Sequence, residues 1–139
     1  KHEIISAEIF MKDKRIKQWF TDEQRSIIKE AIEDHRASIN HEPRTIYGKI
    51  VSTADRTIVD IDYTIRRTYS YGKKKYINLS EEEQIEEIYQ YLLKKYGKNG
   101  YAKIYLKDKE FEQSLDKLRK VLSNKIEFIE RVKKVINEI

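Results

Sequence analysis

Apolar residues recur every three or four positions along most of the chain, a spacing that predicts amphipathic helices. At the start this pattern predicts a helix that ends at about Met11, and then a short helical stretch over 16–20. Thr21 and Gln24 have the spacing of a capping box, so we expect a helix over about 21–36. In that helix His35 falls on the apolar, buried face, and its neighbour Asp34 falls on the more polar side.

The middle of the chain predicts one long helix followed by a loop. Pro43 suits a first helical turn, and from Arg44 an apolar stripe keeps helical phase for some 25 residues. The stripe consists of Tyr47, Val51, Ala54, Ile58, Ile61 and Ile65. Asp62 stands four residues before Arg66, which predicts a surface ion pair on one helix. The segment 66–76 is rich in Arg, Lys and Tyr, and we expect it to be a loop.

The last 60 residues, 80–139, predict further helices. Ser80 and Glu83 form a second capping box, which opens a helix that ends at Tyr96-Gly97. The segment 101–106 fits either an extended strand or the start of a helix. From about Asp108 the pattern is helical again, with a break at Ser123-Asn124. We therefore expect an all-α protein.

Composition narrows the chemistry. The chain has 139 residues, with 4 Gly, 1 Pro and no Cys, which argues against a sandwich or barrel. Without Cys there is no disulfide and no thiolate nucleophile, so a metal would need His and carboxylate ligands. No apolar run approaches the roughly 20 residues of a membrane span, and no signal peptide is recognisable. We expect a soluble, cytoplasmic protein.

Charge says less about partners. The chain carries 29 basic and 24 acidic residues, a net charge of +5, and neither half forms a basic tail. The basic and aromatic segment 66–76 could neutralise phosphates and stack on bases. The chain lacks a recognised nucleic-acid motif and a basic stripe, so we do not expect nucleic acid as a partner. Contact with the phosphates of a nucleotide substrate, or a solvated loop without a ligand, is the better interpretation of this segment. Nine of the ten tyrosines lie from Tyr63 onward, which is compatible with a homodimer interface.

Histidine and aspartate supply the candidate metal ligands. His35 lies on one apolar face, Asp55 lies at the edge of the next apolar stripe, and His2 lies on or beside the apolar face of the first helix. A carboxylate in such a place costs free energy unless it is paired. Imidazole and carboxylate suit Mn, Fe, Ni, Co or Zn when thiolate is absent. His41, in the polar loop before Pro43, is expected to be exposed.

Two runs resemble a known family. The runs IKEAIEDHR over 28–36 and EPRTIYGKIVSTADR over 42–56 are similar to the second half of the HD-domain superfamily of metal-dependent phosphohydrolases. In that family a late helix carries a His on the pattern I, two residues, A-I, two residues, H. The next helix ends its motif on A-D-R or A-D, whose Asp binds the metal. The opening 1–7 resembles the start of a further family helix, so the resemblance covers residues 1 to about 70.

The resemblance implies a fold and a set of site residues. Residues 1–79 would be the later portion of an HD-like helical bundle that lacks its N-terminal helices, and 80–139 would be a helical extension packed on it. Asp55 matches the metal-binding aspartate, whereas His35 and His2 match two extra histidines that serve a second metal or the substrate phosphate. Arg36 and Arg56 follow these motif residues and could face phosphate.

The resemblance also implies an activity. A divalent metal, drawn from Mn, Fe, Ni, Co, Zn and Mg, would lower the pKa of a bound water, and the hydroxide would attack a phosphoester. The substrate would be small and phosphorylated, such as a nucleotide. The family's earlier His and its His-Asp pair have no counterpart upstream of His2.

Two explanations of that departure stay open. Either the chain is the later part of a longer enzyme and inactive alone, which its uncapped start on Lys1 favours, or it is a degenerate member that holds no metal. The alternative function is a non-catalytic helical interaction or nucleic-acid-binding module derived from the same fold.

Overall fold

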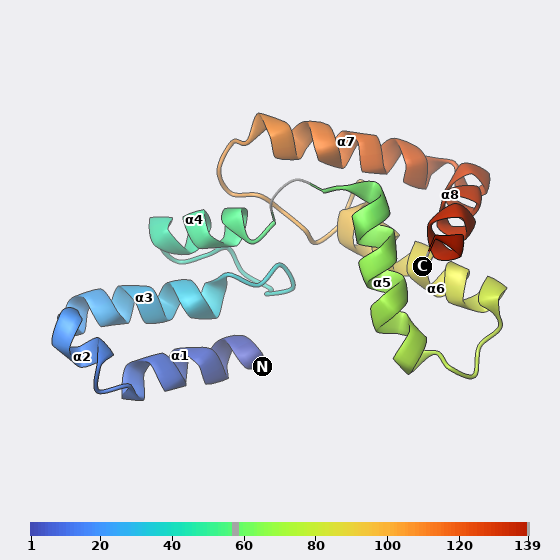
Figure 1. Cartoon of the computed structure of the whole chain (residues 1–139). Coiled ribbons are helices and arrows are strands. Elements are labelled where there is room, and N and C mark those ends of the chain that lie inside the picture. The colour runs from blue at the N-terminus through green and yellow to red at the C-terminus, as the bar shows by residue number, and fades with distance from the viewer. Residues whose placement is uncertain (57–58, 139) are drawn as a thin grey trace. The chain divides into compact units, whose positions relative to one another are not determined.

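The computed structural model describes residues 1–56 and 59–138, and every regular element in them is an α-helix (Figure 1). This finding confirms the predicted all-α class. None of the helices in the described ranges has both the length and the apolar character of a membrane span. The eight helices of these ranges are α1 (His2–Lys12), α2 (Ile16–Trp19), α3 (Asp22–Asp34), α4 (Ile46–Ala54), α5 (Ile61–Lys75), α6 (Glu81–Tyr96), α7 (Lys109–Ser123) and α8 (Lys125–Asn137).

Both predicted capping boxes are confirmed. The Thr21 hydroxyl accepts a hydrogen bond from the Gln24 backbone N–H at 3.2 Å, and the Gln24 side chain accepts one from the Thr21 N–H at 3.0 Å. Ser80 and Glu83 make the same pair of bonds at 3.3 and 2.8 Å. The predicted break at 123–124 is also confirmed, because Asn124 caps α8. Such caps satisfy backbone N–H groups that have no partner inside the helix.

The single long helix predicted from Arg44 is wrong. Pro43 precedes the helix instead of opening it, since Thr45 caps α4 by accepting from the Gly48 N–H at 3.1 Å. Asp60 caps α5 in the same way, with 2.7 Å between its Oδ1 and the Tyr63 nitrogen. A second N-cap marks a second helix start, which the continuous apolar phase did not reveal. Ile58 of that stripe lies outside the described residues.

The predicted loop over 66–76 is also wrong, because α5 continues to Lys75. The segment has no Pro and a single Gly, so nothing in it stops a helix that Asp60 has started. Ile65 and Gly72 are buried on one side of α5, while Arg66, Arg67 and most of the other long polar side chains are exposed. The undecided segment 101–106 forms neither a helix nor a strand.

The chain divides into two compact units. The first unit comprises Lys1–Thr57 and Ala102–Asp108, and the second comprises Ile58–Tyr101 and Lys109–Ile139. The boundary expected at 79/80 falls inside the second unit, between α5 and α6, which pack on each other.

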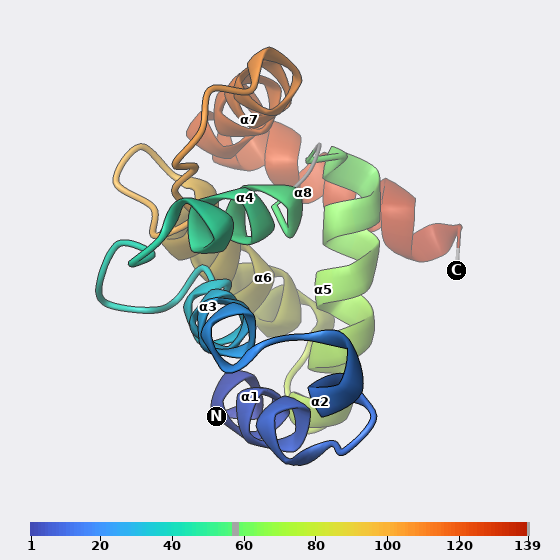
Figure 2. The ribbon, with the colours of Figure 1, turned by 90° about the vertical axis from the view of Figure 1, so that its left-hand side faces the viewer.

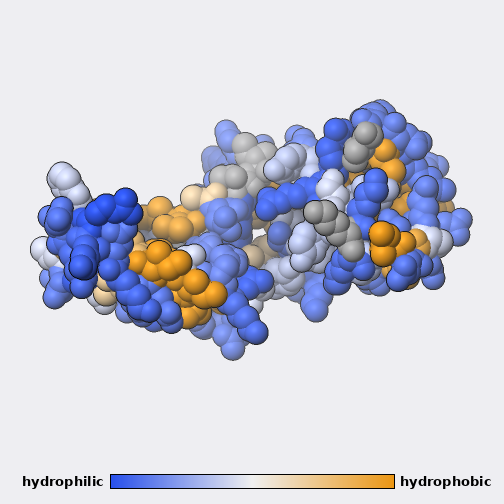
Figure 3. Space-filling view, turned by 60° about the horizontal axis from the view of Figure 1, so that its bottom comes forward, coloured by the Kyte–Doolittle hydropathy of each residue, from blue (hydrophilic) through white to orange (hydrophobic). Residues whose placement is uncertain are grey.

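In the first unit, α3 lies beside both α1 and α4 (Figures 1 and 2). Small residues allow the helices to approach: Ala7 and Ala31 are buried, and a Cβ added to Gly48 of α4 would lie 3.5 Å from the Cβ of Asp34 in α3. Many large apolar side chains of this unit stay exposed, and Figure 3 shows apolar side chains at the surface of the part that holds α1 to α4. They are Ile4, Ile5, Ile9, Trp19, Phe20, Ile46, Tyr47, Ile50 and Val51.

The second unit has a core of large apolar side chains from α5, α6, α7 and α8. Polar bonds tie the helices together, since Arg131 of α8 binds Asp62 of α5 through two bonds of 2.6 and 3.0 Å. The predicted pairing of Asp62 with Arg66 is therefore wrong, and Arg66 instead lies 3.6 Å from Glu138. The fully buried apolar residues are Ile65, Leu92, Phe111, Leu118, Leu122, Phe128 and Val132.

Candidate functional site

The two helical histidines of the sequence-based site lie together. His2 opens α1 and His35 caps the C-terminal end of α3, and their ring centroids are 5.7 Å apart in an edge-to-face arrangement. Nδ1 of His35 lies 2.6 Å from the carbonyl oxygen of Ile32. A carbonyl only accepts hydrogen bonds, so Nδ1 carries the proton, and in the neutral ring the lone pair is then on Nε2. Metal-binding histidines are commonly held in this way, through a bond from their other ring nitrogen.

Glu3 joins this histidine pair to Arg36. Its Oε2 atom lies 3.4 Å from Nδ1 of His2 and 3.4 Å from Nη1 of Arg36. Glu3 is buried on the same side of α1 as Ala7, four residues later, whereas Arg36 remains half exposed. The structure thus brings Arg36, a predicted phosphate contact, to the histidine pair. Sequence reasoning missed Glu3, although its spacing from Ala7 could have indicated a shared helix face.

Arg56 is buried and ties two helix ends together. Its guanidinium donates to the Ser52 carbonyl at 2.8 Å and to the Ser52 hydroxyl, and its Nη2 donates to the His35 carbonyl at 3.3 Å. It also lies over the Tyr105 ring, 5.7 Å from the centroid. Carbonyls at a helix C-terminus lack partners inside the helix, and a cation stabilises them. Arg56 therefore holds the end of α4 against the end of α3.

The predicted metal ligand Asp55 lies at the protein surface. It caps the C-terminal end of α4, its side chain is exposed, and its backbone N–H donates to the Val51 carbonyl at 2.9 Å. Exposure removes the free-energy cost that burial would have imposed on this carboxylate. Within residues 1–56 and 59–138, no three His, Asp or Glu side chains gather closely enough to hold a metal ion.

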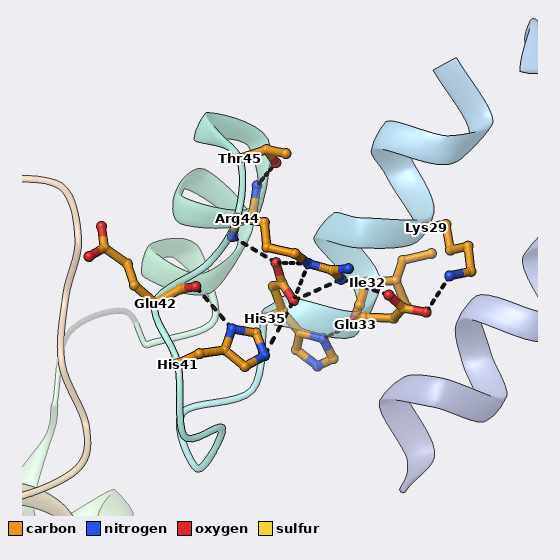
Figure 4. A network of polar contacts seen from close by, with 10 residues as sticks. Lys29, Ile32, Glu33, His35, His41, Glu42, Arg44 and Thr45 are labelled. Atoms are coloured by element: carbon orange, nitrogen blue, oxygen red, sulfur yellow. Dashed lines mark hydrogen bonds and ion pairs between the residues drawn. The ribbon is translucent and has the colours of Figure 1, made fainter. Parts of the chain in front are cut away.

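A polar network around Asp34 is the part of the site that sequence reasoning missed (Figure 4). The Asp34 side chain is only 1% exposed, so its predicted place on the polar side of α3 is wrong. Arg44 donates to it from the backbone N–H at 2.8 Å and from Nε and Nη2 at 3.0 Å each. Arg44 also binds Glu33 at 2.6 Å, and Lys29 binds the other oxygen of Glu33 at 2.6 Å. The loop before α4 thus folds back over the end of α3.

The network sets the protonation of its carboxyl groups. Burial alone raises the pKa of Asp34, but the hydrogen bonds and charge of Arg44, with the charge of His41, outweigh burial and lower the pKa. Hydrogen bonds from Arg44 and Lys29 lower the pKa of Glu33. The same bonds, from Asp34 first and Glu33 second, raise the pKa of Arg44. Both carboxylates are therefore ionised at neutral pH, and Arg44 is bound between them.

An open depression of about 470 Å³ lies between the start of α1, the end of α3 and the loop before α4. His41 lies at its wall, exposed as predicted, with its Nε2 4.0 Å from Asp34. The wall combines acidic groups, Arg44, His41 and apolar side chains, and its carboxylates Asp34 and Glu33 are already paired with Arg44. Its lining residues are Glu3, Ile4, Glu33, Asp34, Ile39, His41, Glu42 and Arg44.

No protein-family model, no curated protein and no solved structure matches this chain. The function is therefore inferred from the arrangement of its residues and from the resemblance of its motifs. Of the five predicted site residues, His2, His35 and Arg36 lie together around Glu3, and Arg56 touches the backbone of His35. Asp55 is linked to them through its neighbour Arg56.

Proposed function

We propose that this chain is part of a metal-dependent phosphohydrolase of the HD-domain type that acts in the cytoplasm on a small phosphorylated substrate such as a nucleotide. The contact between His2 and His35 carries the proposal. These residues are 33 positions apart, come from two helices, and lie with their rings 5.7 Å apart. The resemblance assigns them to the same second-metal or phosphate site, so their proximity supports it.

The chemistry of the donor atoms fits part of such a site. His35 offers the lone pair of Nε2 while its Nδ1 is held by a carbonyl, and His2 lies beside it. Arg36 is a half-exposed cation within reach of the same place and can attract a phosphate oxygen. A bound divalent metal, one of Mn, Fe, Ni, Co, Zn and Mg, would supply an activated water. The proposal places Asp55 among its ligands.

The proposal requires further ligands, because the described residues do not gather three. The resembled family draws them from an earlier His and a His-Asp pair, which we propose lie in a preceding segment of a longer protein. The chain as given would then bind metal weakly and be inactive alone. In the same proposal, α1, α3 and α4 belong to an HD-like bundle, and 80–139 are an extension that contributes to a homodimer.

Metal titration of the chain tests the histidine pair directly. Calorimetry with Ni²⁺ or Zn²⁺ should detect weak binding, and His35→Ala should lower the affinity about tenfold or more, the effect of losing a well-oriented ligand. His41→Ala is the matched control, since His41 is exposed in a loop and should leave the affinity unchanged. Equal affinities for the two variants would contradict the proposed site.

Activity tests the reaction. The full-length protein should hydrolyse a generic phosphodiester such as bis(p-nitrophenyl) phosphate in the presence of Mn²⁺ or Ni²⁺, and Asp55→Ala should abolish that activity. Because Asp55 is exposed, the substitution should leave the helical circular dichroism unchanged. A full-length protein that binds no transition metal and hydrolyses no phosphoester would exclude the enzyme.

A second candidate function has its own supporting observation. One side of α4 exposes Ile46, Tyr47, Ile50 and Val51, each between 42% and 55% accessible. An apolar stripe of this kind is typical of a helix that packs on a partner. It supports the alternative of a non-catalytic helical interaction module. Ile50→Glu should then abolish association, measured by analytical ultracentrifugation, and leave metal binding unchanged.

A further inference from the structure

One side of α5 carries a ridge of aromatic and cationic side chains. Tyr63, Arg67 and Tyr71 follow each other at intervals of four residues, so they lie along one face of the helix. All three are exposed, and the two tyrosines reach 61% and 78% accessibility. Eight residues of helix separate the tyrosines by about 12 Å along the axis. Two aromatic rings thus flank one cation on an open surface, which we call the α5 ridge.

The surroundings of the α5 ridge are basic. No acidic residue occurs between Tyr63 and Lys75. Within residues 1–56 and 59–138, neither Arg67 nor Lys73 forms an ion pair, and both are exposed. Arg66 lies 3.6 Å from Glu138, and Lys75 donates to the Tyr76 hydroxyl at 2.9 Å, with Glu87 of α6 in electrostatic range. Arg67 of the ridge is therefore available to an anion, and Lys73, two residues after Tyr71 and so on a neighbouring face of α5, is a second available cation.

The ridge stands on a fixed helix. The opposite side of α5 buries Ile65 in the core and packs Gly72 so closely that an added Cβ would lie 3.1 Å from the Tyr76 ring. The two bonds from Arg131 to Asp62 hold the start of α5 on α8. A side chain on a packed helix loses less freedom on binding than one on a loop. Residues that were expected to form a loop thus lie on a packed helix, which holds their side chains in place before a ligand binds.

We propose that the α5 ridge binds single-stranded nucleic acid. Tyr63 and Tyr71 stack on two bases, and Arg67 and Lys73 contact the phosphates, the combination that single-strand binders use. An anionic membrane is the less fitting partner, because a membrane-bound helix face needs aliphatic side chains or Trp that can enter the lipid, and the ridge has tyrosines only. This surface lies in the second unit and does not depend on the proposed phosphohydrolase.

The dependence of the affinity on salt concentration distinguishes the phosphate contacts from base stacking. Fluorescence anisotropy of labelled oligothymidylate and oligouridylate, titrated with the full chain, should show saturable binding at low salt. Each phosphate contact contributes about 0.7 to the slope of log affinity against log salt, so the double variant Arg67→Ala/Lys73→Ala should lower that slope by about 1.4. Tyr71→Leu should weaken binding about fivefold or more with the slope unchanged, and Tyr71→Trp should preserve binding.

The chain offers a control of matched charge. Lys117 and Lys120 are exposed on α7 in the same unit, and Lys117→Ala/Lys120→Ala removes the same charge without touching the ridge. Its slope should stay close to that of the unmodified chain. The proposal is overturned if this control loses as much affinity as the ridge variant, if Tyr71→Leu binds as tightly as Tyr71→Trp, or if phosphatidylserine vesicles bind the chain and the oligonucleotides do not.

Discussion

Among the described residues, the largest side chains that are almost wholly hidden from solvent differ between the two units. In the second unit they are Phe, Ile, Leu and Val, whereas in the first unit they are Asp34 and Ser52. The first unit packs through small residues such as Ala7, Ala31 and Gly48 and leaves many of its large aliphatic side chains exposed. Apolar burial therefore stabilises the second unit, and an organised set of hydrogen bonds and charges stabilises the end of α3 in the first.

This difference also separates the two proposed surfaces. In the first unit, polar groups are drawn inward around Glu3 and Asp34, which is the kind of place where ligands and catalysis are found. In the second unit, the core is apolar, and Arg66, Arg67, Lys73 and Lys75 of α5 are exposed to solvent. The buried polar groups of the first unit favour the binding of a small ligand, whereas the exposed cations of the second unit favour the binding of an extended anion.

The largest expected effect is the loss of a core aromatic ring in the second unit. Phe128→Ala should lower the free energy of unfolding by about 3–5 kcal/mol, because Phe128 is fully buried and contacts Tyr89 at 5.2 Å between ring centroids. Ile126→Ala, on the exposed side of the same helix, should change it by less than about 0.5 kcal/mol. Denaturation by urea, followed by circular dichroism, measures both. A small effect at Phe128 would mean that the apolar core is not what stabilises this unit.

The next effect concerns the polar network of the first unit. Asp34→Asn should lower the free energy of unfolding by about 2 kcal/mol, because it removes charged hydrogen bonds to a partner that remains in place. Glu42→Gln is the control, since the exposed pair of Glu42 with Lys49 should contribute less than about 1 kcal/mol. Amide exchange at Ala31 and Ile32 measures the loss in the first unit. Unchanged protection there would show that Asp34 is not needed to stabilise α3.

A low pH should affect the first unit more than the second. Asp34 and Glu33 have lowered pKa values in the folded chain, so their stabilisation is present above the unfolded values of about 4 and is lost as the pH falls through the lower, folded values. We expect the protection factors of α3 amides, which correct for the pH dependence of intrinsic exchange, to fall below about pH 4. Asp34→Asn should flatten this dependence, while its effect at α6 should be negligible. If wild type and variant responded equally to acid, Asp34 would not be a cause of this pH dependence.

The smallest effect is expected for the ion pair of the second unit. Asp62→Asn should lower the free energy of unfolding by about 0.5–1 kcal/mol, because both Asp62 and Arg131 are nearly half exposed and solvent screens their attraction. Thermal denaturation of the variant beside Asp34→Asn gives the comparison. If Asp62→Asn proved the more damaging of the two, charge pairs would matter as much in the second unit as in the first.

Local signals in the sequence were sufficient for much of the secondary structure. The starts of α3 and α6 follow from Thr21 with Gln24 and from Ser80 with Glu83, because each cap is a set of hydrogen bonds within four residues. The division of α4 from α5 was missed for the opposite reason. An apolar stripe indicates which face of a helix is buried. When one helix ends and the next begins with the same spacing of apolar residues, the stripe continues and does not reveal the end of the first helix.

The site was only partly accessible to such reasoning. The resemblance led to His2, His35 and Arg36, and the structure brings these three together. Glu3 and Asp34 were missed because a carboxylate is taken as exposed unless a partner is known, and each of them has a partner in a different segment of the chain. Arg36 lies 33 residues from Glu3, and Arg44 lies 10 residues from Asp34.

The sequence by itself determined the helical class, the capping boxes that begin α3 and α6, and the small set of residues that can bind a metal without cysteine, since these depend on composition and on neighbours within one or two turns. Only the tertiary structure decided that Asp34 is buried and that residues 66–75 continue α5 with Arg66, Arg67 and Lys73 exposed. Burial and exposure depend on which distant segment covers a residue. Here that segment is the loop before α4 for Asp34 and the core of the second unit for α5.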